Sequence, residues 1–201
     1  MVKYVDRNNT YIADTVEIED GTVIYPNVMI EGNSKIGKNC MIHMGCYIKD
    51  SIIGDNTIIY SSHIEESEIK DSCQIGPYAH IRKGNIIDNY AKIGSFVELK
   101  NNKIGKNTKV PHLSYLGDAE VGENVNIGCG VVTANFNGKE KHKTVIENGV
   151  FIGCNVNIIA PIKIEENSFI GAGSTITKDV SKNCLVIERA KTVVKKYEEE
   201  C

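Results

Sequence analysis

The sequence predicts an all-β protein built as a single-stranded parallel β-helix, and two observations carry this prediction. The first is composition: the 201 residues include 29 Ile but only 4 Leu, and β-branched Ile favours strands over helices. The second is an internal repeat, because aliphatic residues recur every six positions along most of the chain. The 18 Gly and 20 Asn, with only 4 Pro, indicate many tight turns between short strands.

The repeat runs six residues at a time from Ile12 to Ile48, passes several five-residue steps, and ends in a regular series from Ile146 to Ile176. The fourth position after each aliphatic residue is usually small or β-branched, as at Thr22. One large and one small inward residue per hexad is typical of a β-helix with flat sides. At three hexads per coil, about 28 units predict roughly nine coils, stacked about 4.8 Å apart in a prism roughly 40 Å long.

The hexads also predict the domain organisation. Residues 1–11 are an irregular lead-in, residues 12–180 form the β-helix, and residues 181–201 form a C-terminal arm or tail. The polar and basic segment 134–143 interrupts the repeat, so we expect it to leave the prism as an extruded loop, and such loops often carry function. Outward-facing apolar residues favour association of copies face to face. Examples are Ile52, Ile58, Ile86, Phe151 and Ile159.

Charge, hydropathy and cysteine usage exclude several classes of function. The 23 basic and 26 acidic residues are spread along the chain and give a net charge of −3, which favours neither nucleic acid nor a membrane as a partner. No apolar run approaches the roughly 18 residues of a spanning helix, and the first residues do not form a signal peptide. Seven Cys without a CxxC pair indicate reduced thiols rather than disulfides or a zinc motif. We therefore expect a cytoplasmic protein.

Ionisable residues that break the hexad pattern mark the candidate chemistry. His112 and Tyr115 interrupt the run of small residues, and they follow Glu98 and Lys100 at a distance that could bring these side chains to one outer surface. Arg82 is one of only three Arg against 20 Lys. Because Arg binds phosphate bidentately and Lys does not, a chain that uses Arg so rarely could reserve it for that task.

Three runs carry a resemblance to a known family: Ile75–Gly84, Gly94–Lys100 and His112–Ala119. They resemble the acetyltransferase domain of the bacterial bifunctional N-acetylglucosamine-1-phosphate uridyltransferase/glucosamine-1-phosphate acetyltransferase, a hexapeptide-repeat family. Shorter matches extend the resemblance, more weakly, over about residues 5 to 190; they are Asn124–Gly128, Asn135–Gly138, Lys141–Thr144 and Gly171–Ser174. The resemblance implies a left-handed β-helix and a homotrimer in which neighbouring subunits complete each site.

The resemblance also implies an activity, acetyl-CoA-dependent N-acetylation of glucosamine 1-phosphate on the route to UDP-N-acetylglucosamine. His112 matches the general base, and Glu98 is a plausible carboxylate to orient it. The positions that match contacts to the amino-sugar phosphate are Arg82, Lys100, Tyr115, Asn126 and Lys141. The positions that match contacts to acetyl-CoA are Cys129, Asn135, Phe136, Cys154, Ala172 and Arg189.

The chain departs from the family pattern in two ways. Phe136 stands where Tyr is usual, Cys129 where Ala is usual, Cys154 where Ser is usual, and Lys83 where Pro is usual. These changes affect the acetyl-CoA positions and leave the catalytic and sugar positions intact. The family's uridyltransferase domain precedes the solenoid, and here the repeat starts within the first dozen residues without a Gly-rich nucleotide loop. We therefore expect no uridyltransferase activity, and a separate protein would supply that step.

Two alternatives remain open, and a third is disfavoured by the residues. The substrate could be another amino sugar such as galactosamine 1-phosphate, which the sequence does not distinguish from glucosamine 1-phosphate. The chain could be a non-catalytic trimeric scaffold, although the intact set of His112, Arg82, Lys100 and Tyr115 argues against this. A metal-dependent carbonic anhydrase on the same scaffold needs three convergent His, and the five His offer no pair at about five-residue spacing. No metal is expected for acetyl transfer.

Overall fold

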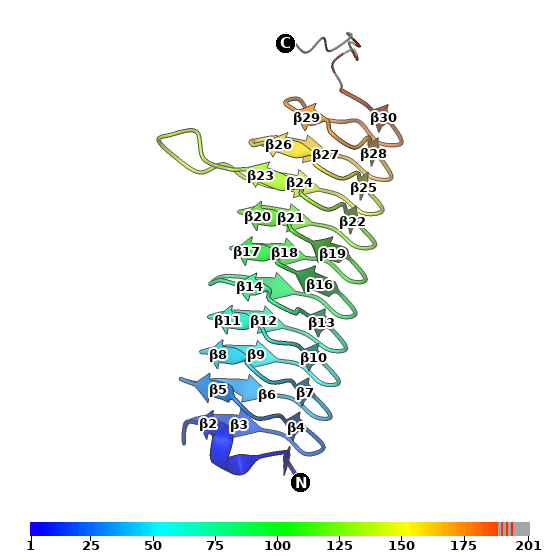
Figure 1. Ribbon diagram of the computed structural model, residues 1–201. Coiled ribbons are helices and arrows are strands. Elements are labelled where there is room, and N and C mark those ends of the chain that lie inside the picture. The colour runs from blue at the N-terminus through cyan, green and yellow to red at the C-terminus, as the bar shows by residue number, and fades with distance from the viewer. Residues whose placement is uncertain (189, 191, 193, 195–201) are drawn as a thin grey trace, which may run out of the picture.

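The chain winds into a three-sided solenoid whose coils stack along one axis (Figure 1), as seen in a computed structural model that describes residues 1–188, 190, 192 and 194. Each coil contributes one short strand to each of three parallel sheets, here called sheets A, B and C. The one helical element in the described residues is the 3-10 turn η1 (Arg7–Asn9). This architecture confirms the all-β, β-helical fold class.

The three sheets contain eleven, ten and nine strands respectively. In chain order, sheet A consists of β1 (Lys3–Tyr4), β4 (Val23–Ile24), β7 (Met41–Ile42), β10 (Ile58–Ile59), β13 (Gln74–Ile75), β16 (Lys92–Ser95), β19 (Lys109–His112), β22 (Asn126–Ile127), β25 (Phe151–Ile152), β28 (Phe169–Ile170) and β30 (Leu185–Val186). Sheet B consists of β2 (Thr10–Ile12), β5 (Val28–Glu31), β8 (Tyr47–Lys49), β11 (His63–Glu65), β14 (His80–Ile81), β17 (Glu98–Lys100), β20 (Tyr115–Gly117), β23 (Val132–Ala134), β26 (Asn157–Ile159) and β29 (Thr175–Ile176). Sheet C consists of β3 (Glu17–Ile18), β6 (Lys35–Ile36), β9 (Ile52–Ile53), β12 (Glu68–Ile69), β15 (Ile86–Ile87), β18 (Lys103–Ile104), β21 (Ala119–Val121), β24 (Thr144–Ile146) and β27 (Ile162–Ile164).

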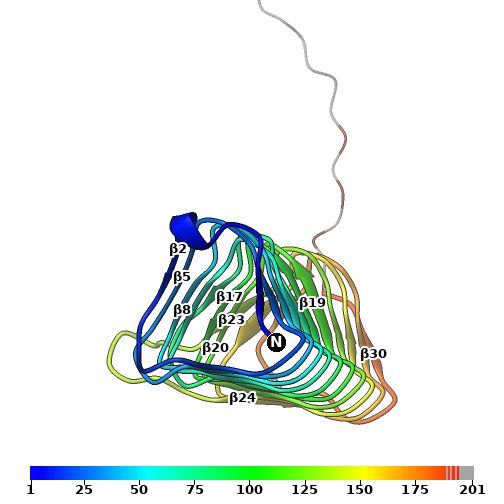
Figure 2. The ribbon, with the colours of Figure 1, turned by 90° about the horizontal axis from the view of Figure 1, so that it is seen from below.

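The handedness of the solenoid follows from the order of the sheets around the axis. Viewed from the N-terminal end, the chain passes from sheet A to sheet B to sheet C counter-clockwise while the coils recede (Figure 2), so the β-helix is left-handed, as predicted. The structure has about ten coils rather than nine. The difference arises because β1 and β30 extend sheet A at the two ends, beyond the hexads that the sequence pattern shows.

The core is a stack of identical side chains, which explains the excess of Ile. In sheet A, for example, Ile42, Ile59 and Ile75 are register partners on successive coils, and all three are fully buried. The small inward positions are buried as well, and most of their polar atoms are hydrogen-bonded: Thr57 Oγ1 accepts from the Cys73 N–H at 3.2 Å and donates to the Lys70 carbonyl. The exception among the described residues is the buried Oγ1 of Thr144, which has no hydrogen-bond partner. A three-sided core this narrow admits branched aliphatic side chains at close packing.

The corner between sheets B and C contains a continuous ladder of buried polar side chains, here called the Ser/Asn ladder. Its members on successive coils are Ser34, Ser51, Ser67, Asn85 and Asn102. Each accepts a hydrogen bond from the backbone N–H at the same corner of the next coil, ending at Ala119. Most five-residue steps of the repeat fall at this corner, such as the step from Ile48 to Ile53. The shortened steps thus mark a corner that polar side chains hold together.

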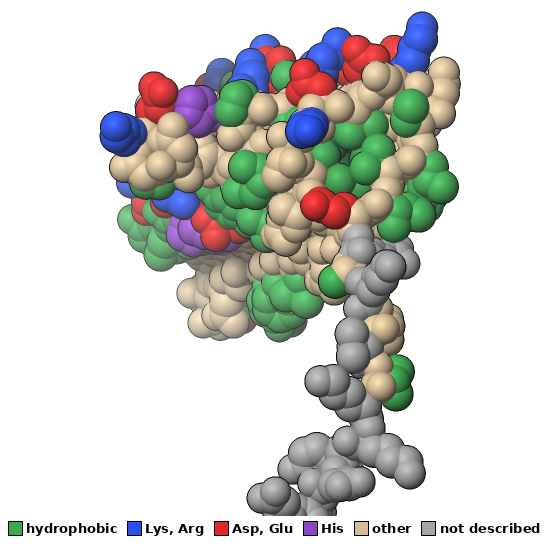
Figure 3. Space-filling view, turned by 90° about the horizontal axis from the view of Figure 1, so that it is seen from above, with side chains coloured by type: hydrophobic (Ala, Val, Ile, Leu, Met, Phe, Trp, Pro, Cys, Tyr) green, Lys and Arg blue, Asp and Glu red, His purple; other side chains and the backbone are tan. Residues whose placement is uncertain are grey.

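The extruded loop and the C-terminal end complete the fold. The loop leaves the prism between β23 and β24 (Figure 1) and is a small hairpin, in which Phe136 pairs with Lys141 and the His142 N–H donates to the Asn135 carbonyl at 2.7 Å. At the C-terminal end, hydrophobic side chains lie uncovered across the last coil (Figure 3), in a hollow lined partly by Ile176 and Leu185. In the described part of the chain, no helix has the length and apolar character needed to cross a membrane.

Candidate active site

Several predicted site residues lie in one column along the corner between sheets A and B. His112 ends β19 and is exposed, one coil above its register partner Ser95. Backbone hydrogen bonds stack the same corner on the later coils: the Asn155 N–H donates to the Cys129 carbonyl at 2.7 Å, and the Gly173 N–H donates to the Cys154 carbonyl at 2.8 Å. The structure therefore places the predicted base at one end of a column that continues through three of the predicted acetyl-CoA positions. These are Cys129, Cys154 and Ala172.

The predicted sugar-phosphate residues gather on the neighbouring face, sheet B. Arg82 directly follows β14, and its N–H donates to the Leu99 carbonyl, which places it beside β17 on the next coil. Glu98 and Lys100 both point outward from β17, and Tyr115 is the register partner of Glu98 on β20. The geometry of parallel strands thus brings residues from three successive coils to one patch.

The patch holds a cluster of three cations, Arg82, Lys100 and Lys141. The ammonium of Lys141, carried in by the extruded loop, lies close enough to Lys100 to hold the pKa of Lys100 below its usual range, and the charge of Arg82 acts in the same direction. Asp118 opposes this shift. Positive charges that converge and repel one another are stabilised by an anion, so this cluster has the chemistry of a phosphate site.

The root of the extruded loop is fixed to the same patch. Asn135 is buried, and its Nδ2 donates to Asp118 Oδ2 at 2.5 Å. A Cβ on Gly117 would lie 2.6 Å from the Tyr115 hydroxyl and 2.7 Å from Asn135 Nδ2, so only glycine leaves these two groups in place. The phenyl ring of Phe136, next in the chain, is 60% exposed. Tyr115 and Asn135 are therefore neighbours at the base of the loop.

Other predicted residues are not brought into this patch. Asn126 lies on β22 in sheet A, as a register partner of Phe151, and so faces away from Arg82. Glu98 forms an ion pair with Arg82, whose Nη1 lies 2.9 Å from Glu98 Oε1, so its expected role in orienting His112 stays a prediction. Arg189 lies outside the described residues.

Sequence reasoning missed the structural part played by Asp118. Its two carboxylate oxygens accept from Asn101 Nδ2 at 2.6 Å and from Asn135 Nδ2, and so join three coils beneath the cation cluster. The length of one coil could have identified Asp118, because Asn101 and Asn135 each lie 17 residues from it in sequence. Polar residues one coil apart in sequence are direct neighbours in this fold.

Comparison with protein families and solved structures gives the same fold class. Residues 7–104 match the family described as the GMPPB C-terminal domain, and residues 143–178 match the family described as bacterial transferase hexapeptide (six repeats). Among solved structures, a UDP-N-acetylglucosamine acyltransferase from Campylobacter jejuni shares the fold, with a TM-score of 0.62 and 20% sequence identity over 81% of this chain and 70% of that one. Fold and repeat define the class: a left-handed hexapeptide-repeat β-helix of the kind found in acyltransferases.

Sequence comparison with curated proteins then identifies the relatives of this chain. The chain is 50% identical over 191 residues to the bifunctional protein GlmU of Clostridium acetobutylicum, and 52% identical over 188 residues to that of Caldicellulosiruptor saccharolyticus. These matches cover 95% and 94% of this chain but only 42% and 41% of the relatives, so the chain spans less than half of their length. The protein is a close homologue of GlmU over nearly all of its sequence.

Proposed function

We propose that the protein is an acetyl-CoA-dependent N-acetyltransferase that acts on an amino-sugar 1-phosphate, with glucosamine 1-phosphate as its substrate. The observation that carries the proposal is the cluster of Arg82 and Lys100 on sheet B with Lys141 of the extruded loop, on the face next to the corner that presents His112. A phosphate held by these cations would anchor the sugar. The homology to GlmU supports the same reaction class.

In the proposed reaction, His112 acts as the general base. Its imidazole removes a proton from the sugar amine as the nitrogen attacks the thioester carbonyl of acetyl-CoA. The new bond joins that nitrogen to the acetyl carbon, the bond from carbon to sulfur breaks, and the proton passes to the departing thiolate, which leaves as CoA. The corner column through Cys129, Cys154 and Ala172 supports a bound acetyl-CoA next to His112. Placing the two reactants together supplies much of the rate.

The distribution of residues over two faces supports the homotrimer as part of this proposal. Asn126 lies on sheet A whereas Arg82 lies on sheet B, so one copy of the chain does not present both to a single sugar. A neighbouring subunit that packs its sheet A against the corner of His112 would complete the set of sugar contacts. Molar mass in solution tests the oligomer directly, and a monomer would contradict the shared site.

A mixing experiment tests whether subunits share the site. Arg82→Ala and Asn126→Ala proteins are each assayed alone, and then after they are coexpressed in one cell with different tags and purified through both. If the two residues of each site come from different subunits, some sites in the mixed trimers contain both native residues. Activity above the mean of the two separate variants is expected, whereas activity at that mean would place both residues in one subunit.

Release of CoA thiol from acetyl-CoA in the presence of glucosamine 1-phosphate tests the reaction itself. We expect His112→Ala to lower the rate by roughly 10²–10⁴-fold, the usual contribution of a general base. Galactosamine 1-phosphate, assayed in parallel at the same acetyl-CoA concentration, distinguishes the two sugars. Absence of thiol release with every amino-sugar phosphate would overturn the enzymatic proposal.

A further inference from the structure

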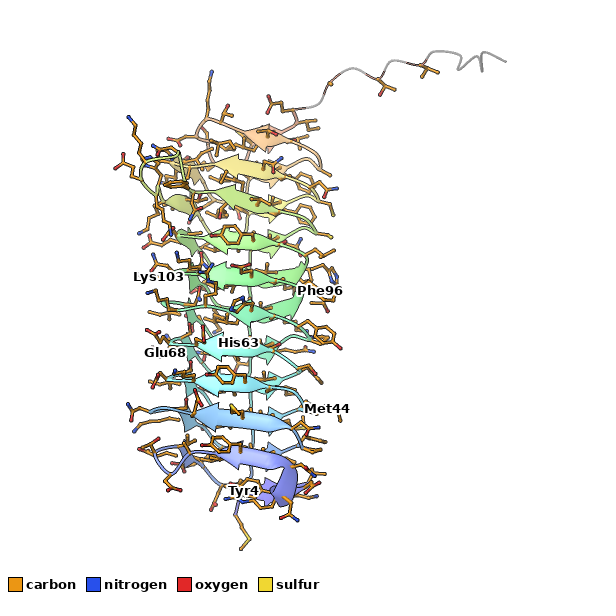
Figure 4. The ribbon with its side chains drawn as sticks, turned by 60° about the vertical axis from the view of Figure 1, so that its left-hand side comes forward. Tyr4, Met44, His63, Glu68, Phe96 and Lys103 are labelled. Carbon is orange, nitrogen blue, oxygen red and sulfur yellow. The ribbon has the colours of Figure 1, made fainter. Side chains whose placement is uncertain are left out.

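Three potential metal ligands converge on sheet B, outside the patch described above. His63 and Glu65 point outward from β11, and His80 points outward from β14, where it is the register partner of His63. Figure 4 shows His63 near the middle of the solenoid, on the face between Met44 and Phe96 at one edge and Glu68 and Lys103 at the other. His63 and His80 are 17 residues apart, one coil, which is why local sequence spacing does not reveal the pair.

The distances suit a shared ion. His63 Nε2 lies 3.1 Å from Glu65 Oε1, and one ligand atom from each of His63, Glu65 and His80 lies within 4.8 Å of the other two. Ligand atoms bonded at about 2.1 Å to a tetrahedral ion are about 3.4 Å apart, so the pair at 3.1 Å is already close to this separation. The side chains of His63 and Glu65 are 46% and 38% exposed, which leaves them room to rotate toward a shared ion.

The surroundings orient the ligands. The ring of Tyr47 lies 4.5 Å from the ring of His63 on one side, and the ring of His80 meets it edge-on at 5.1 Å on the other. Lys49 is the register partner of Glu65 on the preceding coil, and a Glu carboxylate is ionised at neutral pH. Two imidazoles and an ionised carboxylate are the donors that Zn²⁺ and its neighbours in the transition series prefer.

We propose that His63, Glu65 and His80 bind one divalent transition-metal ion, of the class of Zn²⁺, Co²⁺ and Ni²⁺, with water in the remaining coordination positions. The ion would join β11 to β14, on the coil that also carries Arg82 and one coil before Glu98. The site borders the patch of Arg82 and Glu98 but uses none of its residues, so its existence does not depend on the proposed function.

Titration with Co²⁺ and Zn²⁺ tests the site in the full chain. The exposed thiols of Cys154 and Cys184 are alkylated first, because thiolates would bind the same ions. Calorimetry is expected to show one ion per chain, and Co²⁺ is expected to develop visible bands of a low-symmetry site without a thiolate charge-transfer band. Absence of saturable binding would overturn the proposal.

Matched variants test the assignment of the ligands. We expect His63→Ala and His80→Ala to weaken binding at least about 10-fold, and Glu65→Gln, which keeps the shape of the side chain, to do the same. His43→Ala is the control, because His43 stacks between Tyr25 and Tyr60 on the sheet A side and should leave affinity unchanged. An equal loss in the control variant would contradict the site.

A spectroscopic measurement avoids any effect of mutation on folding. In the unmutated protein, one equivalent of Zn²⁺ is expected to shift the imidazole NMR signals of His63 and His80 and to leave those of His43 in place. Uniform small shifts of all the imidazoles would indicate non-specific binding and refute the proposal.

Discussion

Arg82 and Glu98 form an ion pair between adjacent coils, with Arg82 Nη1 2.9 Å from Glu98 Oε1. Both side chains are about two-fifths exposed, and exposed pairs of this kind contribute little to stability. The pair instead fixes the direction of a guanidinium, which has five N–H donors in a planar fork. The Arg82 guanidinium is thereby held in one direction, as the proposed phosphate site requires.

Replacement of Arg82 by Ala should weaken binding of the sugar phosphate and leave folding intact. Loss of charge-assisted hydrogen bonds worth about 1.5–3 kcal/mol predicts a KM for glucosamine 1-phosphate roughly 10–100-fold higher, with a small change in kcat. Steady-state kinetics measure this effect. Lys103→Ala, which removes one positive charge on sheet C, is the matched control. An unchanged KM in Arg82→Ala would remove Arg82 from the phosphate site.

The loop residue Lys141 should control the ionisation of Lys100. Two adjacent ammonium groups disfavour the charged form, which is why the pKa of Lys100 is lowered, so Lys141→Ala should raise this pKa toward its ordinary value. NMR titration of the lysine side chains measures the change. In the control Lys143→Ala, the lost ammonium is one that pairs with Glu120 at 2.6 Å, and the pKa of Lys100 should stay where it is. A fall in the Lys100 pKa on Lys141→Ala would contradict the cluster.

Acetyl-CoA should protect one cysteine selectively. Cys154 is exposed in the column that contains His112, and Cys184 is exposed on the last coil. At acetyl-CoA concentrations ten times its Kd, occupancy predicts roughly 10-fold slower alkylation of Cys154 and no change at Cys184. Burial raises the pKa of Cys46 and of Cys73 to about 11, so these thiols should remain unlabelled in the native protein. Mass spectrometry of peptides measures each site, and equal protection of Cys154 and Cys184 would argue against the corner as the cofactor surface.

The Ser/Asn ladder should contribute measurably to stability. Asn102 is 1% exposed, accepts from the Ala119 N–H, and donates to the Leu116 carbonyl at 2.9 Å. Asn102→Ala leaves these buried groups unpaired and is expected to cost about 1–3 kcal/mol, read as a lower urea midpoint. The exposed Asn157 on β26 provides the control, and its change to Ala should stay within about 0.5 kcal/mol. Equal effects of the two changes would show that the ladder is incidental.

The hexads predicted the body of the fold because they record which side chains face inward. The Ile residues of successive coils stack as expected, and outward positions such as Ile52 and Phe151 are indeed exposed, at 50% and 40%. The ends were harder to predict, since β1 and β30 have a neighbouring coil on one side only and do not need a full hexad. The sequence did not predict why some steps of the repeat have five residues. The buried Ser and Asn of the Ser/Asn ladder, at the corner between sheets B and C, explain them.

The site was predictable in its residues and less so in its contacts. Resemblance to a family singled out Arg82, Lys100 and Lys141; the coil geometry brings Arg82 beside Lys100, and the extruded loop brings Lys141 to them. The ion pair of Glu98 with Arg82 and the contact of His63 with His80 each join outward-facing side chains one coil apart. The repeat pattern constrains only inward residues, so it gives no information about these contacts.

The extruded loop leaves the register of the stacked strands unchanged. Lys103 pairs with Glu120 after 17 residues, whereas Ala119 pairs with Thr144 after 25, yet the strands stay in register. An insertion that leaves and returns at one corner does not shift the height of any later residue along the axis. Such a scaffold separates two kinds of evolutionary change: whole coils alter the length of the rod, and corner insertions alter its chemistry. The segment that brings Lys141 to Lys100 is therefore free to change in length and sequence while the rod beneath it stays the same.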